Sequence, residues 1–376
     1  MIVKMQPMTR KKWKQLFAGL LAACVAVWVA AAVRKSLNGL SRLSHIVCNL
    51  PLQSGPMSYR DLEVLSPTSV LIFQNDVNQA QKSYRSWIYN LDTVTGMVTE
   101  NRALEKETKN VEFSTPRLAS DGSFLLVKSL FPRAPQGLNV TAITPAGTVI
   151  KRWNIGGSDS ALLEGQAYVE FGGGFVPLDS QHGWLEYAAK GDVSNGKSLM
   201  HTLHGADSAN ISECVIDRGE HILGLDNQGH LIGFRGNSYR FGSKDNEIHK
   251  FDANNVNRKV STNTLPIDPI QLDDGGILIK SPRNIELYRN SNRLLYVVEY
   301  GGEPIYPKFM RKWSTMFREA VGPVRSELWI ADTDGHNARL LAYPDLYIQP
   351  DTVKWAQDGK SILFVSGNQL RRIAVN

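Results

Sequence analysis

Cysteine is scarce in this chain, and the spacing of its few cysteines excludes common metal sites. Cys24, Cys48 and Cys214 are the only cysteines among 376 residues, and no two of them form a Cys-x-x-Cys pair. Cysteine and histidine spacings typical of structural zinc sites are therefore missing from the sequence. A Gly-x-Ser-x-Gly elbow is missing too, which argues against a serine enzyme of the α/β-hydrolase class.

Acidic residues are absent from one end of the chain. Residues 1–35 hold seven Lys or Arg and no Asp or Glu, which leaves 35 basic and 36 acidic residues after Lys35. The net charge of +6 and the isoelectric point near 9.1 therefore come from the N-terminus. A basic surface is the electrostatic sign of nucleic-acid binding. Because the bulk of the chain has no excess of basic residues, we expect no nucleic-acid partner.

Charge is also absent from Leu16–Val33, which reads LFAGLLAACVAVWVAAAV. At about 1.5 Å per residue, this run makes roughly 27 Å of helix, close to the hydrocarbon thickness of a bilayer. We predict a retained transmembrane anchor, because signal-peptide cores usually hold only about 7 to 15 apolar residues. Two alternatives stay open: a cleaved signal peptide, and a lipoprotein signal in which Cys24 of LAAC is lipidated.

The charges beside this run predict its orientation. Five basic residues precede it and three follow closely, so the short tail should stay in the cytoplasm. The predicted organisation is a cytoplasmic tail over 1–15, a transmembrane anchor over 16–33, a linker over 34–44 and an extracytoplasmic domain over 45–376.

Short apolar strands separated by glycine turns recur through this large domain. The clearest copy is VKWAQDGKSILFVSGNQLRRIAVN at Val353–Asn376. Similar pieces are PRLASDGSFLLVKS at 116–129, ECVIDRGEHILGLD at 213–226 and PIQLDDGGILIKS at 269–281, with weaker copies at 65–75, at 171–179 and around Trp313. Glycine supplies the positive φ angles that tight hairpin turns require. We therefore expect a strand, a tight turn and a second strand in each copy.

The spacing of these turns predicts the architecture. Successive turns lie about 40 to 56 residues apart, the length of a four-stranded propeller blade. The sequence thus predicts an all-β, seven-bladed β-propeller of four-stranded antiparallel blades, with six blades as the alternative. The last blade has only three strands before Asn376, so a strand within His45–Arg60 should complete it and close the ring.

One stretch resembles a known family. ELWIADTDGHNARLLAYPDLYIQPDTVKWAQDGKSILFVS, at Glu327–Ser366, is similar to the repeat of TolB-type β-propellers, in which a strand ending in Asp-x-Asp-Gly precedes a Trp-Ser-x-Asp-Gly block. This chain departs from the pattern at Ala356, where the family has Ser. The resemblance implies an extracytoplasmic propeller of six or seven blades, of a kind that commonly binds proteins. Together with the predicted anchor, it favours a bacterial protein of the cytoplasmic membrane whose propeller is periplasmic.

Several residues suggest chemistry but have simpler structural explanations. His201 and His204 lie on a predicted strand, where residues three apart point to opposite faces, so they should not share a metal. Asp332 and Asp334 in DTDG lack the remaining ligands of a calcium loop and are expected in a turn. Cys48 and Cys214 are expected as buried thiols, with a disulfide between them as the alternative.

Residues 306–325, YPKFMRKWSTMFREAVGPVR, allow two interpretations. As a helix they would place apolar residues on one face and basic residues on another, which suits a membrane surface or a partner. The favoured interpretation is a pair of strands in the sixth blade, because the repeat spacing requires a blade there.

No catalytic, cofactor-binding or metal-ligating residue is predicted, and no cofactor. We expect a non-catalytic, membrane-anchored propeller that binds a protein or glycan of the cell envelope. The alternative is a propeller enzyme, a lyase, hydrolase or cyclotransferase, whose site is assembled from loops in the central funnel.

Overall fold

The computed structural model describes most of the chain beyond Leu37. The described residues are 37–51, 58–78, 83–108, 111–113, 117–118, 124–130, 138–155, 169–170, 175–177, 183–189, 197–203, 212–217, 220–236, 246–252, 255–265, 270–271, 277–278, 280–288, 291–300, 326–342 and 345–375, with the single positions 19, 22, 26, 29, 30 and 33. The predicted anchor at Leu16–Val33 lies largely outside them. No helix within the described residues is long and apolar enough to cross a membrane.

The strands within these ranges gather into six sheets of four or five strands and one of two, and all their pairings are antiparallel. The first sheet holds β2 (Ser58–Ser66), β3 (Ser69–Asn78), β4 (Ser83–Asp92) and β5 (Val98–Glu100). The second holds β6 (Val111–Phe113), β7 (Arg117–Leu118), β8 (Phe124–Leu130), β9 (Leu138–Ile143) and β10 (Val149–Ile155). The third holds β11 (Val169–Glu170), β12 (Phe175–Pro177), β13 (Gly183–Ala189), β14 (Lys197–Leu203) and β15 (Ser212–Asp217).

The remaining sheets follow in chain order, apart from one strand. The fourth sheet holds β16 (Glu220–Leu225), β17 (His230–Gly236), β18 (Asn246–Asp252) and β19 (Asn255–Thr264). The fifth holds β22 (Lys280–Leu287), β23 (Arg293–Tyr300), β24 (Ser326–Asp332) and β25 (Arg339–Leu340). The sixth holds β26 (Lys354–Trp355), β27 (Ser361–Ser366), β28 (Gln369–Ala374) and, from the other end of the chain, β1 (Ser44–Asn49). A separate hairpin joins β20 (Ile270–Gln271) to β21 (Ile277–Leu278).

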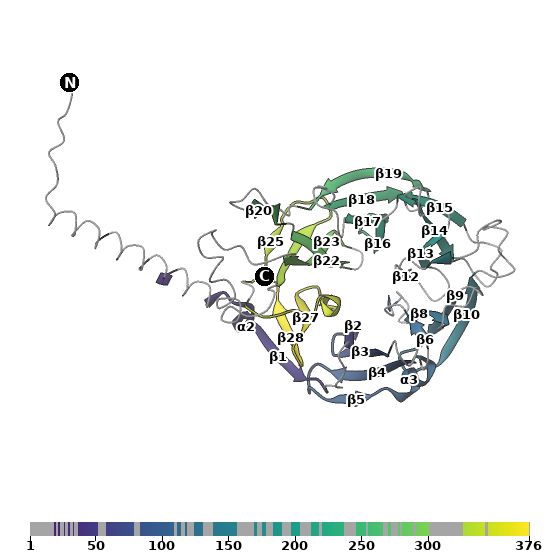
Figure 1. Ribbon diagram of the computed structural model, residues 1–376, viewed down its shortest axis with the longest axis horizontal. Helices are drawn as coiled ribbons and strands as arrows, with labels where there is room; N and C mark the ends of the chain where they lie inside the picture. The colour runs from purple at the N-terminus through teal and green to yellow at the C-terminus, as the bar shows by residue number, and fades with distance from the viewer. Residues whose placement is uncertain are drawn as a thin grey trace, which may run out of the picture.

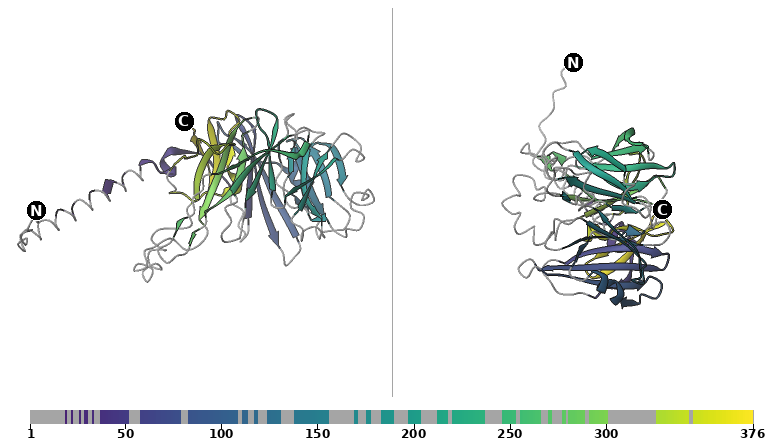
Figure 2. Two further views of the ribbon diagram at one scale, coloured as in Figure 1. Left: turned by 90° about the horizontal axis from the view of Figure 1, so that it is seen from above. Right: turned by 90° about the vertical axis from the view of Figure 1, so that its right-hand side faces the viewer.

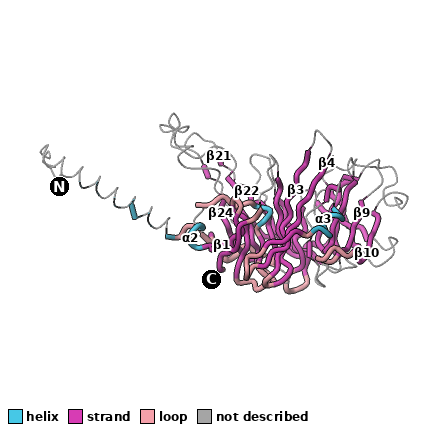
Figure 3. Tube along the Cα trace, turned by 90° about the horizontal axis from the view of Figure 1, so that it is seen from below, coloured by secondary structure: helices cyan, strands magenta, loops and turns pink. Residues whose placement is uncertain are grey.

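The six larger sheets stand around a ring, and the β20–β21 hairpin stands off from it (Figure 1). Contacts join each sheet to the next: β2 to β7, β7 to β12, β12 to β16 and β16 to β22. The circle closes where β26, and the short 3-10 helix η5 (Pro350–Thr352) before it, contact β2. Figures 2 and 3 show the ring from the side, with strands making up most of it. Small antiparallel sheets in this radial arrangement form a β-propeller.

The two ends of the domain meet in the sixth sheet. β1 pairs with β28 antiparallel, with Ser44 opposite Ile373 and Asn49 opposite Gln369. This confirms the prediction that a strand from the segment after the apolar run completes the last sheet. β1 lies in the first part of the expected range, while Ser58–Arg60 belongs to β2 of the first sheet.

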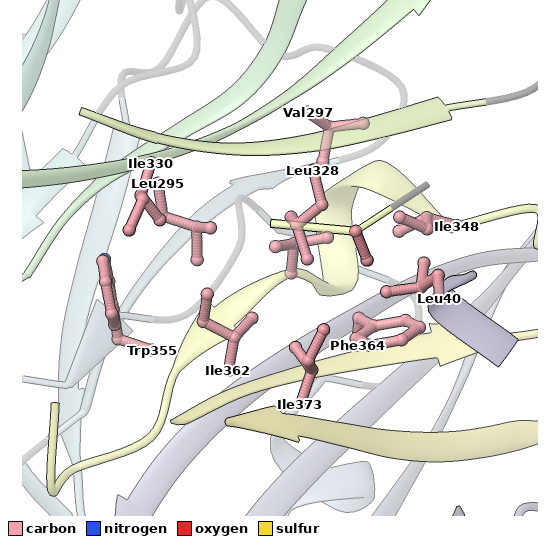
Figure 4. Close-up of a cluster of buried hydrophobic side chains, with 12 residues drawn as sticks. Leu40, Leu295, Val297, Leu328, Ile330, Ile348, Trp355, Ile362, Phe364 and Ile373 are labelled. Carbon is pink, nitrogen blue, oxygen red and sulfur yellow. The ribbon is translucent and has the colours of Figure 1, made fainter. Parts of the chain in front are cut away.

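The apolar residues of β27 explain why the sheets stack face to face. Ile362 and Phe364 pack against the fifth sheet, in a cluster with Leu295, Val297, Leu328 and Ile330 (Figure 4). Leu363 and Val365 point the other way and pack with Leu62, Val70 and Ile72 of the first sheet. Successive side chains of a strand face opposite sides of its sheet, so a strand between two neighbouring sheets is apolar at every position. Each such fully buried side chain stabilises the fold by about 1.5–3 kcal/mol.

Several predicted hairpins are confirmed. β26 and β27 are joined by the turn at Asp358-Gly359, where Gly359 has φ 62° and its N–H donates to the Ala356 carbonyl at 3.0 Å. The Asp358 carboxylate accepts a hydrogen bond from the Lys360 N–H at 2.8 Å. β7 and β8 form the second predicted hairpin, with Arg117 opposite Leu125.

The prediction of a hairpin at ECVIDRGEHILGLD is wrong. β15 pairs with β14 in the third sheet, whereas β16 pairs with β17 in the fourth. The two strands therefore belong to different sheets, and Arg218-Gly219 between them lies outside the described residues. A glycine between two apolar strands suits either connection, and the partner of each strand depends on residues beyond the stretch.

The structure also contains a helix that the sequence pattern did not predict. α3 (Arg102–Thr108) follows β5, and Asn101 caps it by accepting the Leu104 N–H at 3.1 Å. The Asn101 amide donates to the Pro145 carbonyl at 2.9 Å, which ties the start of α3 to the β9–β10 turn of the next sheet. The second helix, α2 (Leu40–Leu43), directly precedes β1 and buries Leu40 in the cluster of Figure 4.

Candidate functional site

Two groups of polar residues stand out. One lies where the fifth and sixth sheets meet, and the other lies where β1 pairs with β28. The first, which we call the seam, comprises Glu286, Tyr288, Arg293, Lys354 and Trp355. Lys354 on β26 and Glu286 on β22 form an ion pair with 3.1 Å between Nζ and Oε2. Their side chains are only 4% and 16% exposed. A charge so far from water is tolerated when it is paired, because an unpaired buried charge is strongly destabilising.

Aromatic and cationic contacts complete the seam. The Arg293 guanidinium lies over the Trp355 ring at 4.5 Å and donates to the Gly359 carbonyl at 2.7 Å. The Tyr288 and Trp355 rings are 5.4 Å apart, and the Tyr288 hydroxyl donates to the Gln357 carbonyl at 2.9 Å. The turn between β26 and β27 is therefore held by side chains of the preceding sheet. These contacts join two sheets.

The second group, which we call the closure clamp, centres on Arg371 of β28. Its Nε donates to the Ser44 hydroxyl at 2.9 Å, and its terminal nitrogens donate to the Gln369 amide oxygen at 2.9 Å and the Ser41 carbonyl at 2.8 Å. The Asp345 carboxylate accepts the Ser41 N–H at 2.8 Å. Burial lowers the pKa of Arg371 from its ordinary value, against the opposing charge of Asp345. Arginine nonetheless stays charged in proteins, so the clamp is a set of charge-assisted hydrogen bonds.

Asp226, a buried carboxylate in the fourth sheet, is also held by its surroundings. Its Oδ1 accepts the N–H groups of Gln228 and His230, both at 2.8 Å, and its Oδ2 lies 3.4 Å from Lys250 Nζ. Burial acts to raise the pKa of Asp226, but the two amides and the Lys250 charge outweigh it, so this pKa lies below its ordinary value. The carboxylate shapes the β16–β17 turn.

The histidines and aspartates considered in the sequence do not form a shared site among the described residues. His201 lies on β14 as expected, opposite Glu213 of β15, while His204 lies outside the described residues. Asp332 ends β24, and its carboxylate accepts a hydrogen bond from the Asn337 amide. Asp334 accepts the His336 N–H at 2.9 Å. Both aspartates thus belong to the predicted turn between β24 and β25. Within the described ranges, His, Cys, Asp and Glu form no group of three that would hold a metal ion.

The cysteines and the ambiguous stretch at 306–325 have separate outcomes. Cys48 on β1 is a free, buried thiol, and desolvation by burial raises its pKa to about 11, which makes a poor nucleophile. Cys214 lies on β15, opposite Met200. Residues 306–325 and Cys24 lie outside the described residues.

The important polar residues were thus invisible to sequence analysis. Glu286, Lys354 and Arg371 were not singled out, because an isolated charged residue in a strand does not reveal its partner. The one available signal was Arg371 in LRRIAV, where it interrupts an apolar alternation. In chemical terms, the seam, the clamp and the Asp226 turn hold strands and turns in place.

Comparison with known proteins yields similarity of fold only. No family model matches the chain, and no curated protein matches it. Among solved structures, it is similar to the β-propeller domain of the trilobed protease from Pyrococcus furiosus, with 9% identity, a TM-score of 0.44 and coverage of 85% of this chain and 94% of that one. It is also similar to the WD40 repeats of RRP9, with 10% identity, a TM-score of 0.42 and coverage of 89% and 100%.

A third similar structure is the acylaminoacyl peptidase of Pyrococcus horikoshii, with 11% identity and a TM-score of 0.44. Here 82% of this chain matches 49% of the peptidase. The similar structures thus include a set of WD40 repeats and the propeller domain of a protease. The class of this protein, a β-propeller, is defined by its own sheets.

Proposed function

We propose that this protein is a single-pass, membrane-anchored propeller of the bacterial cell envelope that binds a protein or glycan without catalysis. The proposed organisation is a cytoplasmic tail over 1–15, an anchor over 16–33, a linker over 34–44 and an extracytoplasmic propeller over 45–376. The resemblance of Glu327–Ser366 to TolB-type repeats supports the extracytoplasmic location.

The observation that carries this proposal is how the ring is closed. β1 begins at Ser44, only 11 residues beyond the apolar run, and the closure clamp fixes α2 and β1 to β28. An anchor at Leu16–Val33 would hold the whole ring through α2 and β1, and the short connection would allow the ring little movement away from the membrane. A ring held this way suits a binding platform, because it presents the loops between its sheets at a constant distance from the membrane.

Three buried charges, which catalysis could have used, have structural partners instead. Lys354, Asp226 and Arg371 are each engaged by residues that position strands or turns. Catalytic groups need a substrate within reach of the reacting atoms, and these three are directed at structural partners. The alternative of an enzyme with a funnel site thus finds no support in these three residues.

For the number of blades we propose six. The contacts that run from β2 through β7, β12, β16 and β22 to β26 and back to β2 support this number. A seventh blade, the first expectation from turn spacing, would need a further sheet built from residues outside the described ranges.

The test measures the membrane topology of the chain and then the capture of a binding partner. The full chain with a C-terminal tag is expressed in a bacterial host, and spheroplasts are treated with external protease. We expect the chain to stay in the membrane fraction after extraction with alkaline carbonate. We also expect the external protease to digest the propeller. Chemical cross-linking in intact cells should then capture an envelope protein or glycan.

The control for this capture keeps residues 1–36 and replaces the propeller with an unrelated soluble domain. Components captured by both chains are attributed to the anchor. A propeller protected from external protease contradicts the topology. Capture no greater than that of the control contradicts the binding role and favours the enzyme alternative.

A further inference from the structure

Exposed apolar side chains gather at one part of the propeller rim. Beyond the predicted anchor, seven large apolar residues among those described are 45% to 75% exposed. One of them, Val260, lies on β19 of the fourth sheet. The other six lie on α2, on β1 or beside them, and we call them the rim patch: Leu37, Leu43, Ile46, Val94, Met97 and Tyr347.

Contacts to α2 and β1 bring these six residues into one region. Asp345, two residues before Tyr347, accepts the Ser41 N–H at 2.8 Å and so joins the loop of Tyr347 to α2. Gly96, in the β4–β5 turn between Val94 and Met97, packs so closely on β1 that an added Cβ would lie 3.2 Å from the Val47 carbonyl oxygen. Figure 1 shows α2, β1 and β5 following one another along the same edge of the ring.

The chain leaves this edge little room to move away from a membrane. Leu40, the start of α2, lies seven positions after Val33, the end of the predicted anchor. Even fully extended, seven residues span at most roughly 25 Å. Leu40 is buried in the core and Ser41 is held by Arg371, so α2 cannot swing out to lengthen this connection. An anchor that ends at Val33 would therefore keep the rim patch close to the bilayer surface.

From this proximity and the exposed apolar side chains, we propose that the rim patch rests on the lipid bilayer, at the boundary between headgroups and acyl chains. This inference depends on the proposed membrane anchor. Arg34, Lys35 and Arg42 lie in or next to the same segment, and basic residues attract anionic headgroups. Tyr347 has the amphipathic ring that is common at membrane interfaces. A lipid surface is chemically matched to this mixture of apolar, aromatic and basic side chains.

This contact would set the orientation of the propeller. β1 is the outermost strand of the sixth sheet and lies on the rim of the ring (Figure 1). A ring resting on its rim keeps both of its open faces away from the bilayer. Loops on either face then remain accessible to a partner in the envelope.

The test measures lipid contact in the full chain. Starting from a chain with Cys24→Ser and Cys214→Ser, single variants Ile46→Cys and Met97→Cys are labelled with bimane and reconstituted in vesicles of phosphatidylethanolamine and phosphatidylglycerol. Buried Cys48 is kept, and the parent chain gives its background labelling. Val260→Cys is the matched control, because Val260 is 49% exposed, as is Ile46, but lies on another sheet.

We expect lipids spin-labelled near the headgroup to quench the labels at positions 46 and 97 and to leave the label at 260 unquenched. Equal quenching at all three positions, or at none, overturns the inference. Labels at 46 and 97 that are shielded from aqueous iodide without lipid quenching indicate a protein occupant, such as a second copy, and also overturn it.

Flotation of the same vesicles separates this inference from the anchor on which it rests. A chain that floats with the vesicles but whose labels are unquenched contradicts only the rim contact. A chain that does not float contradicts both the anchor and the rim contact.

Discussion

Single residues at the ends of strands decide how neighbouring sheets fit together. Gly359 is required in its turn for two reasons, and Gly367 shares only the first of them. Its φ of 62° lies in the left-handed region, and an added Cβ would lie 2.6 Å from the ring of Tyr288 in the fifth sheet. Gly367, in the next turn of the sixth sheet, has φ 58°, but no described residue lies within 4 Å of an added Cβ. A comparison of the two glycines therefore separates the cost of backbone strain, which applies to both, from the cost of steric overlap with a neighbouring sheet, which applies to Gly359.

We predict that Gly359→Ala destabilises the propeller more than Gly367→Ala does. The left-handed backbone alone should lower the free energy of unfolding by about 1–2 kcal/mol in both variants. Overlap with Tyr288 should add roughly 1–3 kcal/mol at position 359 only. Urea unfolding of the full chain in detergent, followed by tryptophan fluorescence, measures both values. Equal losses would show that Tyr288 moves aside and that the seam is not tightly packed.

At the scale of elements, the notable feature is a short helix and a strand fixed by one arginine. β1 precedes the rest of the propeller in the chain yet belongs to its last sheet, and α2 lies directly before it. The backbone pairing of β1 with β28 supplies one set of contacts. Arg371 supplies another by reaching Ser44 and the Ser41 carbonyl, which lie at the start of β1 and in α2. The joint between the predicted anchor and the ring therefore depends on a side chain 327 positions from Ser44.

We predict that Arg371→Met loosens α2 and β1. Loss of these charge-assisted hydrogen bonds should lower local stability by about 1–3 kcal/mol, which corresponds to about tenfold or faster amide hydrogen exchange in β1. Hydrogen exchange read by mass spectrometry checks this. Arg372→Met is the matched control, since Arg372 neighbours Arg371 on the same strand and its buried Nε makes no hydrogen bond to any of the described residues. If the control loosens β1 as much as Arg371→Met, the clamp has no role.

At the scale of the whole molecule, stability depends on a closed circle. The sixth sheet buries its apolar faces against two neighbours, as Ile362 and Leu363 show on opposite sides of β27. If the circle opens at one point, two sheets lose partners together. β1 closes the sheet where this opening would occur, and it covers a strand edge that would otherwise be free to pair with other chains.

We predict a large difference between two truncated chains. A chain of residues 37–376 keeps α2 and β1, whereas a chain of residues 51–376 loses both. The second chain also loses Leu40, Cys48 and Leu50 from the core, at roughly 2 kcal/mol for each buried apolar side chain. It should unfold at a much lower temperature and aggregate, as measured by thermal unfolding with light scattering. Similar stability of the two chains would contradict closure by β1.

Local patterns were enough to predict much of the fold. Alternating apolar residues and Asp-Gly turns identified the hairpins at β7–β8 and β26–β27. Counting strands in the last sheet showed that it needs one more. The prediction failed at Arg218-Gly219, where the strands on either side belong to different sheets, and it missed α3, which Asn101 caps through contacts with the next sheet.

The candidate site was far less predictable than the fold. Lys354 and Glu286 are 68 positions apart in the sequence, and no local pattern around either residue predicts that they pair. The same holds for Arg371 and its partners in α2 and β1.

The sequence by itself determined the class of the protein, because strand alternation, turn chemistry and repeat spacing are properties of neighbouring residues. It also determined that the last sheet needs a strand from another part of the chain, since the strands near the C-terminus can be counted from the sequence alone. Only the tertiary structure decided which strand closes the ring, which buried charges pair and where the exposed apolar residues gather. These depend on contacts between residues far apart in the chain, which form only when the ring closes.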